Sequence, residues 1–392
     1  AQPKPRDSDR HPKGQGAQVA SCVFHHISWS SEATAGKAEA AVASQSRQDC
    51  KKPNPEQTMS TSSSVVAKVS GHYMTVVLGP AFCAIAGLGY SFFSLSPLRT
   101  ALAFSFAAST YTLYITLDGA EYTGEGRPDP VFSRDDWLIR TIRSYLRMTL
   151  HRTKEVEKQL VSQSATGIGQ AVYALFPHGV NGDFRPLIDG MMPEAFPSVA
   201  PPRTLAANVL FRIPGIREFA LKTGCVDAGR KTAQKVLSKG LSILVLPGGL
   251  DEQVMTVHGR ERVFLKKRFG FVSLAMQHGV PLVPAYVFGC SDLYFTSSFL
   301  QGLRLWLVRT IRVALPIYWG RCGFAYYPQP MGFPLPVAQN VVFGDPIFVP
   351  KKENPSKEEV AVEHEKFIAA LVALFDAHKE QFGVGDRTLE VL

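Results

Sequence analysis

The stretch AVYALFPHGVNGD, residues 171–183, sets the pattern of the C-terminal half of the chain. It starts as a short apolar run, Ala171 to Leu175, which is typical of a buried β-strand. It then changes to proline, glycine and asparagine, which favour tight turns and let a ligand approach the backbone. His178 and Asp183 lie five positions apart in that turn. The stretch therefore predicts a buried strand whose end carries polar groups that could do chemistry.

The same alternation of apolar runs and turns continues on the C-terminal side. Two more buried strands are expected, one from Leu241 to Leu246, ending in the turn PGG, and one from Pro281 to Phe288. Three helices are expected: Asp227 to Leu237, Arg262 to Gln277, and a final helix that begins at Ser356 with a Ser356–Glu359 capping box. Strands that alternate with helices predict an α/β domain, with a sheet flanked by helices, over residues 168–392.

The N-terminal part has a different composition. Residues 1–70 are polar and lack apolar periodicity, which predicts a disordered leader. Two charge-free runs follow, Met74 to Leu95 and Thr100 to Leu117, and each has about the ~20 residues that cross a bilayer. Because only a few residues separate them, residues 71–118 are predicted to form a membrane hairpin. The basic residues around it put both flanks on the cytoplasmic side. Two buried core helices are the alternative.

Residues 119–167 are expected to connect the hairpin to the α/β domain along the membrane surface. Apolar and aromatic side chains alternate there with arginines, as in a helix that lies in a headgroup layer. These side chains are Trp137, Leu138, Ile142, Tyr145, Leu146 and Met148.

Composition narrows the class of partner. The 392-residue chain carries a formal net charge of +9, yet only 19% of its residues are charged, against about 25% in ordinary soluble domains. A basic balance favours anionic membranes, phosphates or nucleic acid. The chain has no Cys/His finger spacing, so nucleic acid is disfavoured. Its six cysteines are scattered without a Cys-x-x-Cys pair, which argues against a metal site.

Three stretches carry the candidate chemistry. In the first, His178 could remove a proton from a hydroxyl and Asp183 could orient its ring, although a histidine that is merely hydrogen-bonded is the alternative. In the second, Gly248 and Gly249 precede Glu252, which could orient a hydroxyl or accept from a basic residue; an ordinary strand-to-helix turn has the same pattern. The third is a basic run that suits phosphates, or else forms a solvated helix face. Its side chains are Arg262, Lys266, Lys267 and Arg268.

Taken together, the motifs from about residue 74 to the C-terminus resemble the diacylglycerol acyltransferase type 2 family, within the wider glycerolipid acyltransferase superfamily. The motifs occur in the family's order: FPHG at 176–179, GGLDE at 248–252, RFGFVSLA at 268–275, VPAYVFG at 283–289 and GDPI at 344–347. One position departs from the pattern. The family has His-Pro-His-Gly, and here Phe176 replaces the first histidine.

The resemblance implies a glycerolipid-acyltransferase-like mixed sheet and transfer of an acyl group from acyl-CoA to diacylglycerol. It implies His178 as the general base, with no cofactor and no metal. Asp183 and Glu252 are further catalytic candidates, and the substrate-contacting candidates are Pro177, Gly179, Gly248, Gly249 and the four basic residues. The expected location is the endoplasmic reticulum membrane, with the lipid droplet surface as a further one, and a homo-oligomer is left open.

Several alternatives remain. The acceptor could instead be a monoacylglycerol, a long-chain alcohol, a sterol or a lysophospholipid. An alternative of a different functional class is an inactive hairpin protein that coats lipid droplets. A soluble α/β hydrolase is disfavoured because the chain has no Gly-x-Ser-x-Gly elbow.

Overall fold

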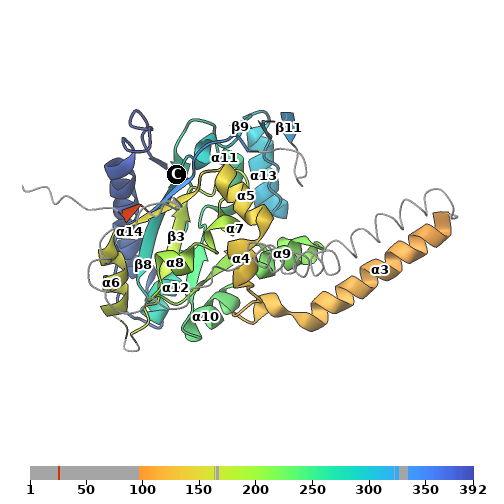
Figure 1. Cartoon of the computed structure of the whole chain (residues 1–392), viewed down its shortest axis with the longest axis horizontal. Coiled ribbons are helices and arrows are strands. Elements are labelled where there is room, and N and C mark those ends of the chain that lie inside the picture. Colours follow the sequence, from red (N-terminus) through yellow and green to blue (C-terminus); the bar gives the residue numbers. More distant parts are fainter. Residues whose placement is uncertain (1–24, 27–96, 163, 165–166, 322, 326–333) are drawn as a thin grey trace, which may run out of the picture.

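The computed structural model of the chain describes residues 25–26, 97–162, 164, 167–321, 323–325 and 334–392. An eight-stranded mixed sheet forms its centre, in the order β1-β2-β12-β8-β3-β6-β4-β5 (Figure 1). The strands in that order are β1 (His25–His26), β2 (Thr149–Arg152), β12 (Asn340–Phe343), β8 (Leu282–Phe288), β3 (Val172–Phe176), β6 (Ser242–Val245), β4 (Pro202–Ala206) and β5 (Cys225–Asp227).

Strand β3 occupies the middle of the parallel part of this sheet. It pairs in parallel with β6 on one side, with Val172 opposite Ile243, and with β8 on the other, with Leu175 opposite Ala285. Strands β4 and β5 continue the parallel order, whereas β12 runs antiparallel to β8. In such sheets ligands bind beyond the carboxyl ends of the strands. Phe176, the last residue of β3, therefore leads directly to the edge where a site is expected.

Two layers of helices cover the sheet, and the two-residue period of β3 divides its side chains between them. Tyr173 and Leu175 pack in the core beneath one layer. This layer comprises α4 (Pro130–Asp135), α5 (Trp137–Tyr145), α6 (Lys154–Ser162), α7 (Arg185–Ile188) and α8 (Met192–Ala195). Val172, Ala174 and Phe176 face the core beneath the other layer. The other layer comprises α10 (Arg230–Ser238), α12 (Gly270–His278) and α14 (Lys357–His378). The predicted α/β architecture, a mixed sheet flanked by helices, is confirmed.

The strands expected at residues 171–175, 241–246 and 281–288 are present to within a residue or two at each end. The final helix is also confirmed. Ser356 caps α14, accepting from the Glu359 amide, while the Glu359 side chain accepts from the Ser356 amide.

Two predicted helix starts are wrong. Asp227 ends strand β5, and its carboxylate accepts from the amide of Gly229, so α10 begins only at Arg230. Arg262 begins the short strand β7 (Arg262–Val263), which pairs with β13 (Glu390–Val391), and α12 starts only at Gly270. The alternate burial of Val263 and Leu265 has a strand's period of two, which the basic residues after them obscured.

Helix α3 (Pro97–Asp118) extends away from the body of the molecule (Figure 1). The segment Arg99–Tyr122 is long and apolar enough to cross a membrane, and none of its most apolar window is buried. The second predicted run, Thr100 to Leu117, is thus one exposed helix rather than a buried core helix. The first run, Met74 to Leu95, lies outside the described residues, as does most of the predicted leader.

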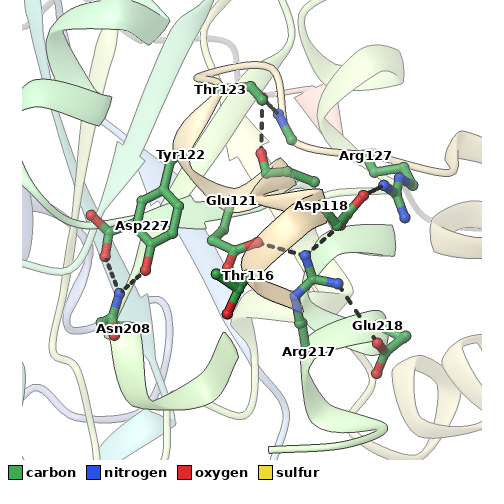
Figure 2. A network of polar contacts seen from close by, with 12 residues as sticks. Thr116, Asp118, Glu121, Tyr122, Thr123, Arg127, Asn208, Arg217, Glu218 and Asp227 are labelled. Atoms are coloured by element: carbon green, nitrogen blue, oxygen red, sulfur yellow. Dashed lines mark hydrogen bonds and ion pairs between the residues drawn. The ribbon is translucent and has the colours of Figure 1, made fainter. Parts of the chain in front are cut away.

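The end of α3 is fastened to the body by a buried cation. Arg217, on α9 (Ile216–Lys222), is 0% exposed. Its Nη2 donates to Asp118 at the end of α3 and to Glu121, at 2.7 Å, in the following turn. Figure 2 shows these carboxylates converging on the guanidinium, with Glu218 beside it. A buried ion pair of this kind holds its elements together because breaking it strands a charge.

The connection after α3 belongs in part to the core. Leu146 and Met148 are buried, and the Arg143 guanidinium points inward, where its Nη2 donates to the carbonyl oxygens of Ser133 (3.0 Å) and Leu187 (2.9 Å). Trp137, by contrast, is largely exposed. The role of residues 119–167 at a membrane surface stays a prediction that now rests on Trp137 and its exposed neighbours.

Candidate active site

His178 follows strand β3 and lies in the turn at the carboxyl edge of the parallel strands. The turn needs its glycines. Gly179 and Gly182 both have a φ of 66°, a backbone conformation that favours glycine. A methyl group added at Gly179 would also lie 2.6 Å from Cys290 Sγ, so this position has no room for a side chain. The sequence thus folds His178 into a narrow, fixed bend.

The imidazole of His178 is held as a neutral base. Its Nδ1 lies 3.2 Å from the carbonyl oxygen of Gly179, which can only accept, so Nδ1 carries the proton. Burial lowers the pKa of His178, although hydrogen bonds to the backbone oppose the shift. In this tautomer Nε2 keeps a free lone pair at neutral pH. That nitrogen can accept a proton from a hydroxyl group.

Glu252 supports this turn from beneath. It lies on α11 (Gly249–Met255) and is 1% exposed. Its Oε1 accepts from the backbone N–H of His178, and its Oε2 accepts from the backbone N–H of Phe264 at 2.8 Å. Burial raises the pKa of Glu252 to about 7, against the lowering effect of these two hydrogen bonds. The structure therefore joins Glu252 to His178 through the backbone.

The two glycines before Glu252 have different roles. A methyl group at Gly248 would lie 2.0 Å from Glu252 Oε2, so the carboxylate lies against the Gly248 backbone. Gly249 has a φ of 56° and open space where a Cβ would stand. Gly248 thus makes room for Glu252, while Gly249 is required by its backbone conformation.

Asp183 lies in the same turn as His178. Among the described residues, no hydrogen bond joins the Asp183 carboxylate to the His178 ring. Burial raises the pKa of Asp183 to about 6, and hydrogen bonds from Tyr294 and Asn181 partly offset this rise. The residue before it, Gly182, lies against the ring, since a methyl group there would be 3.7 Å from Cε1 of His178. His178 and Asp183, the predicted pair, are thus close along the chain, and the pKa of the Asp183 carboxyl group, about 6, lies near neutral pH.

Phe176 has a plain structural role. It is 0% exposed and faces the core beneath α14, with its ring 6.1 Å from that of Phe367. It points to the sheet face shared with Val172 and Ala174. The phenylalanine that stands here in place of the family's histidine therefore packs in the hydrophobic core.

The four basic candidates divide into two pairs. Arg268 bonds to Asp251 and to the carbonyl oxygen of Gly248 (3.1 Å), and Arg262 bonds to Glu390 at 2.8 Å. Lys266 and Lys267 are exposed in the turn between β7 and α12. The two arginines already have carboxylate partners, so the two lysines are the better candidates for an external phosphate.

Sequence reasoning missed one contributor. Cys290, to which no role was given, is buried under the turn, where its thiol lies 3.8 Å from the carbonyl oxygen of Pro177. It lies two residues after the end of β8, the parallel neighbour of β3, so strand adjacency was the signal that could have found it. Among the described residues, no group of three or more His, Cys, Asp or Glu could hold a metal ion.

Comparison with known proteins shows the family to which the chain belongs. The family model for diacylglycerol acyltransferase matches residues 109–392. The chain is 36% identical over 231 residues to human acyl-CoA wax alcohol acyltransferase 2, which covers 56% of this chain and 68% of that protein. It is 33% identical over 242 residues to mouse diacylglycerol O-acyltransferase 2, covering 56% and 60%. It is 30% identical over 285 residues to human 2-acylglycerol O-acyltransferase 3, covering 69% and 79%.

A crystal structure of the 1-acyl-sn-glycerophosphate acyltransferase PlsC from Thermotoga maritima superposes with a TM-score of 0.36 at 16% identity, over 79% of this chain and 92% of that one. This likeness is too low to support a functional inference. The sequence matches span only part of each relative, and less than two thirds of the mouse protein. The family match covers well over half of this chain and includes the whole His178 turn, and so the chain belongs to the diacylglycerol acyltransferase family, a family of acyltransferase enzymes.

Proposed function

We propose that this chain transfers an acyl group from acyl-CoA to the free hydroxyl of diacylglycerol, giving triacylglycerol and CoA. The observation that carries the proposal is His178, a neutral imidazole with a free Nε2 at the carboxyl edge of the parallel strands. A hydroxyl group is a poor nucleophile until a base removes its proton.

In the proposed step Nε2 of His178 takes the hydroxyl proton as the oxygen attacks the thioester carbonyl. The new carbon–oxygen bond forms and the carbon–sulfur bond breaks. The proton then passes from His178 to the departing CoA thiolate. No acyl-enzyme is required, and Asp183 helps to orient the ring once the acceptor is bound.

The oxyanion of the tetrahedral intermediate needs hydrogen-bond donors. The N–H of His178 is occupied by Glu252, so the amide of Gly179 and its neighbours in the turn are the proposed donors. Glu252 acts as a positioning residue, because its two backbone hydrogen bonds hold the turn in place. Lys266 and Lys267 are the proposed contacts for the phosphates of acyl-CoA, with Pro177 and Gly248 shaping the floor of the site.

The setting of the reaction is the membrane. Helix α3 together with residues 74–95 is proposed to form the hairpin, with both ends on the cytosolic side of the endoplasmic reticulum, from which the chain could also reach lipid droplets. This arrangement would bring an insoluble acceptor laterally to His178. A long-chain alcohol is the second candidate acceptor, because a relative at 36% identity is named as a wax alcohol acyltransferase.

The test uses membranes from cells that lack their own neutral-lipid synthesis and express the full chain. Labelled oleoyl-CoA is supplied with diacylglycerol, monoacylglycerol or a long-chain alcohol in parallel. Removal of a general base typically costs about 10²–10⁴-fold in rate, so His178→Ala should lose the transfer activity. His278→Ala is the matched control, since burial lowers the pKa of His278 too, at the far end of α12. Transfer by His178→Ala at the parent's rate contradicts the base.

The role of the lysines has its own test. The Lys266→Glu, Lys267→Glu variant should raise the KM for acyl-CoA and leave the KM for diacylglycerol unchanged. Lys231→Glu, an exposed lysine on α10, is the control. Equal KM values for acyl-CoA in all three proteins rule the lysines out.

A further inference from the structure

Helix α13 (Gln301–Ile311) differs in part from the surface helix of a soluble protein. It buries one of its two arginines, because Arg304 is only 5% exposed and its Nη2 donates to the carbonyl oxygen of Ser297 at 2.6 Å. It buries Val308 but exposes two larger apolar side chains, since Leu303 is 51% and Trp306 57% exposed. Ordinary surface helices do the reverse. The inward Arg304 and Val308 thus fix which face of α13 is outward, and that face carries Leu303 and Trp306.

The outward apolar residues continue on both sides of the helix. Together they form what we call the α13 surface: Phe299, Leu300, Leu303, Trp306, Ile311 and Val313. Isolated exposed apolar residues are normal, whereas a concentration of this kind marks an interaction site. Tryptophan, leucine and phenylalanine are also the residues with which interfacial helices enter a bilayer.

The charged residues of the segment that contains this surface have one sign. Arg309 and Arg312 are exposed within it. Between Asp292 and Asp345 the sequence contains no aspartate or glutamate at all. An apolar face whose own segment of the sequence carries only cations complements an anionic layer with an apolar interior, such as a bilayer with acidic headgroups.

The α13 surface also has a direct structural connection to the candidate site. Val308 of α13 packs with Val254 of α11, and the Gln301 side chain donates to the Val254 carbonyl oxygen at 3.2 Å. The same helix α11 carries Glu252, which holds the N–H of His178. Figure 1 shows α13 on the half of the body from which α3 extends, away from α14 and α6.

From these observations we infer that the α13 surface is a second contact with the membrane, separate from α3, which binds an anionic phospholipid bilayer. Leu303 and Trp306 enter the boundary between headgroups and acyl chains, and Arg309 and Arg312 meet lipid phosphates. The contact holds α11, and through it the His178 turn, at the lipid surface. Its value for catalysis rests on the proposed function, but the contact itself can be measured without any acyl transfer.

The full-length chain is reconstituted into vesicles of phosphatidylcholine and phosphatidylserine with brominated or ordinary acyl chains. The emission of Trp306 is obtained as the difference between the parent and Trp306→Phe. Since the ring is expected to lie within the acyl boundary, bromolipid should quench roughly half or more of this component. Trp319, half-buried on β10 (Tyr318–Gly320), is the control from the same region and should be quenched less.

An unquenched Trp306 component in vesicles that carry the chain on flotation overturns the inference. If the chain also forms cross-linked dimers there, a second copy covers the α13 surface instead. Quenching in phosphatidylcholine alone that equals quenching with phosphatidylserine overturns the anionic part. Because no reaction is involved, an inactive chain with a quenched Trp306 would refute the proposed function and not this contact.

A paired set of variants tests the link to the site. In the Leu303→Glu, Trp306→Glu variant, acyl transfer to a bilayer-borne acceptor should fall several-fold with the melting temperature unchanged. Val362→Glu introduces one glutamate at a similarly exposed apolar position on α14, and it should leave transfer at the parent's level. Equal transfer by both variants would mean that the α13 surface does not serve the site.

Discussion

The Arg217 cluster and the His178 turn are both buried and polar, but they satisfy their charges in opposite ways. Arg217 faces Asp118 and Glu121, so each buried charge has an opposite charge beside it. In the His178 turn, burial raises the pKa of Glu252 to about 7 and of Asp183 to about 6, while it lowers that of His178. The carboxyl groups of Glu252 and Asp183 accept hydrogen bonds mainly from backbone amides and neutral side chains.

This contrast separates architecture from chemistry. Paired charges stay ionised over a wide pH range and hold elements in place, whereas buried groups that titrate near neutral pH are typical of functional sites. The cluster fixes the exposed helix α3 to the domain. The turn keeps a base neutral and its neighbours ready to change protonation.

The largest effect is expected from a substitution that breaks the Arg217 cluster. Arg217→Met leaves Glu121 buried without a cation and leaves Asp118 with only the exposed Arg127, and breaking a buried pair from one side costs about 3–5 kcal/mol. Thermal unfolding of the full chain in detergent measures the loss. Arg127→Met removes an exposed partner of Asp118, 55% exposed, and such surface pairs contribute only about 0–1 kcal/mol. Equal losses of stability in the two variants would mean that Arg217 contributes no more to stability than a surface arginine does.

The next effect concerns Glu252. In Glu252→Gln one amide N–H, that of His178 or Phe264, faces the NH₂ of the new side chain, and a buried unsatisfied donor costs about 1–3 kcal/mol. We expect a lower kcat with little change in either KM, because the turn that holds His178 loosens. Glu363→Gln is the matched buried control, since Glu363 pairs with the exposed Lys366. A kcat as high as that of the control would remove Glu252 from the positioning role.

Phe176→His tests whether a polar side chain at position 176 increases the rate of acyl transfer. The substitution restores the family's His-Pro-His-Gly pattern, but position 176 is in the core against Phe367. Burying an unpaired imidazole should cost about 1–3 kcal/mol and give no faster transfer. Phe176→Leu serves as the apolar control. A rate above the parent's would show that this position communicates with the site despite its burial.

The smallest effect is a change in pH dependence. The folded-state pKa of Asp183, about 6, lies above its usual value of 3.8, so its contribution to stability is present at acid pH and is lost as pH rises through 6. Asp183→Asn lacks this loss. The melting temperature of the variant minus that of the parent should therefore grow from about pH 4 to about pH 6 and then level off. A constant difference across that window contradicts the raised pKa.

The same variant tests the orienting role. Mispositioning a catalytic base normally costs orders of magnitude in rate. A turnover within about twofold of the parent's would leave Asp183 as a buried neighbour of His178 with no part in orienting it.

Local patterns in the sequence were enough to predict much of the frame. The buried strands around residues 171–175, 241–246 and 281–288, the capped helix at Ser356, and the position of His178 at a strand end all depend on neighbours within a few residues. Apolar runs, glycines and caps act over that range, so their effects can be read without the fold. The same patterns failed at Asp227 and Arg262, where pairing with a distant strand or a side-chain turn overrode the helical appearance.

What only the tertiary structure decided are the contacts across long separations. Glu252 reaches His178 over 74 positions, and Arg217 reaches Asp118 over 99. Whether Phe176 faces the core or the site, and whether Arg262 is free or paired, likewise depends on elements far away in the chain. The sequence by itself determined which residues could do chemistry. Burial and long-range pairing decided which of them carry it, because desolvation and charge neutralisation exist only once the chain is packed.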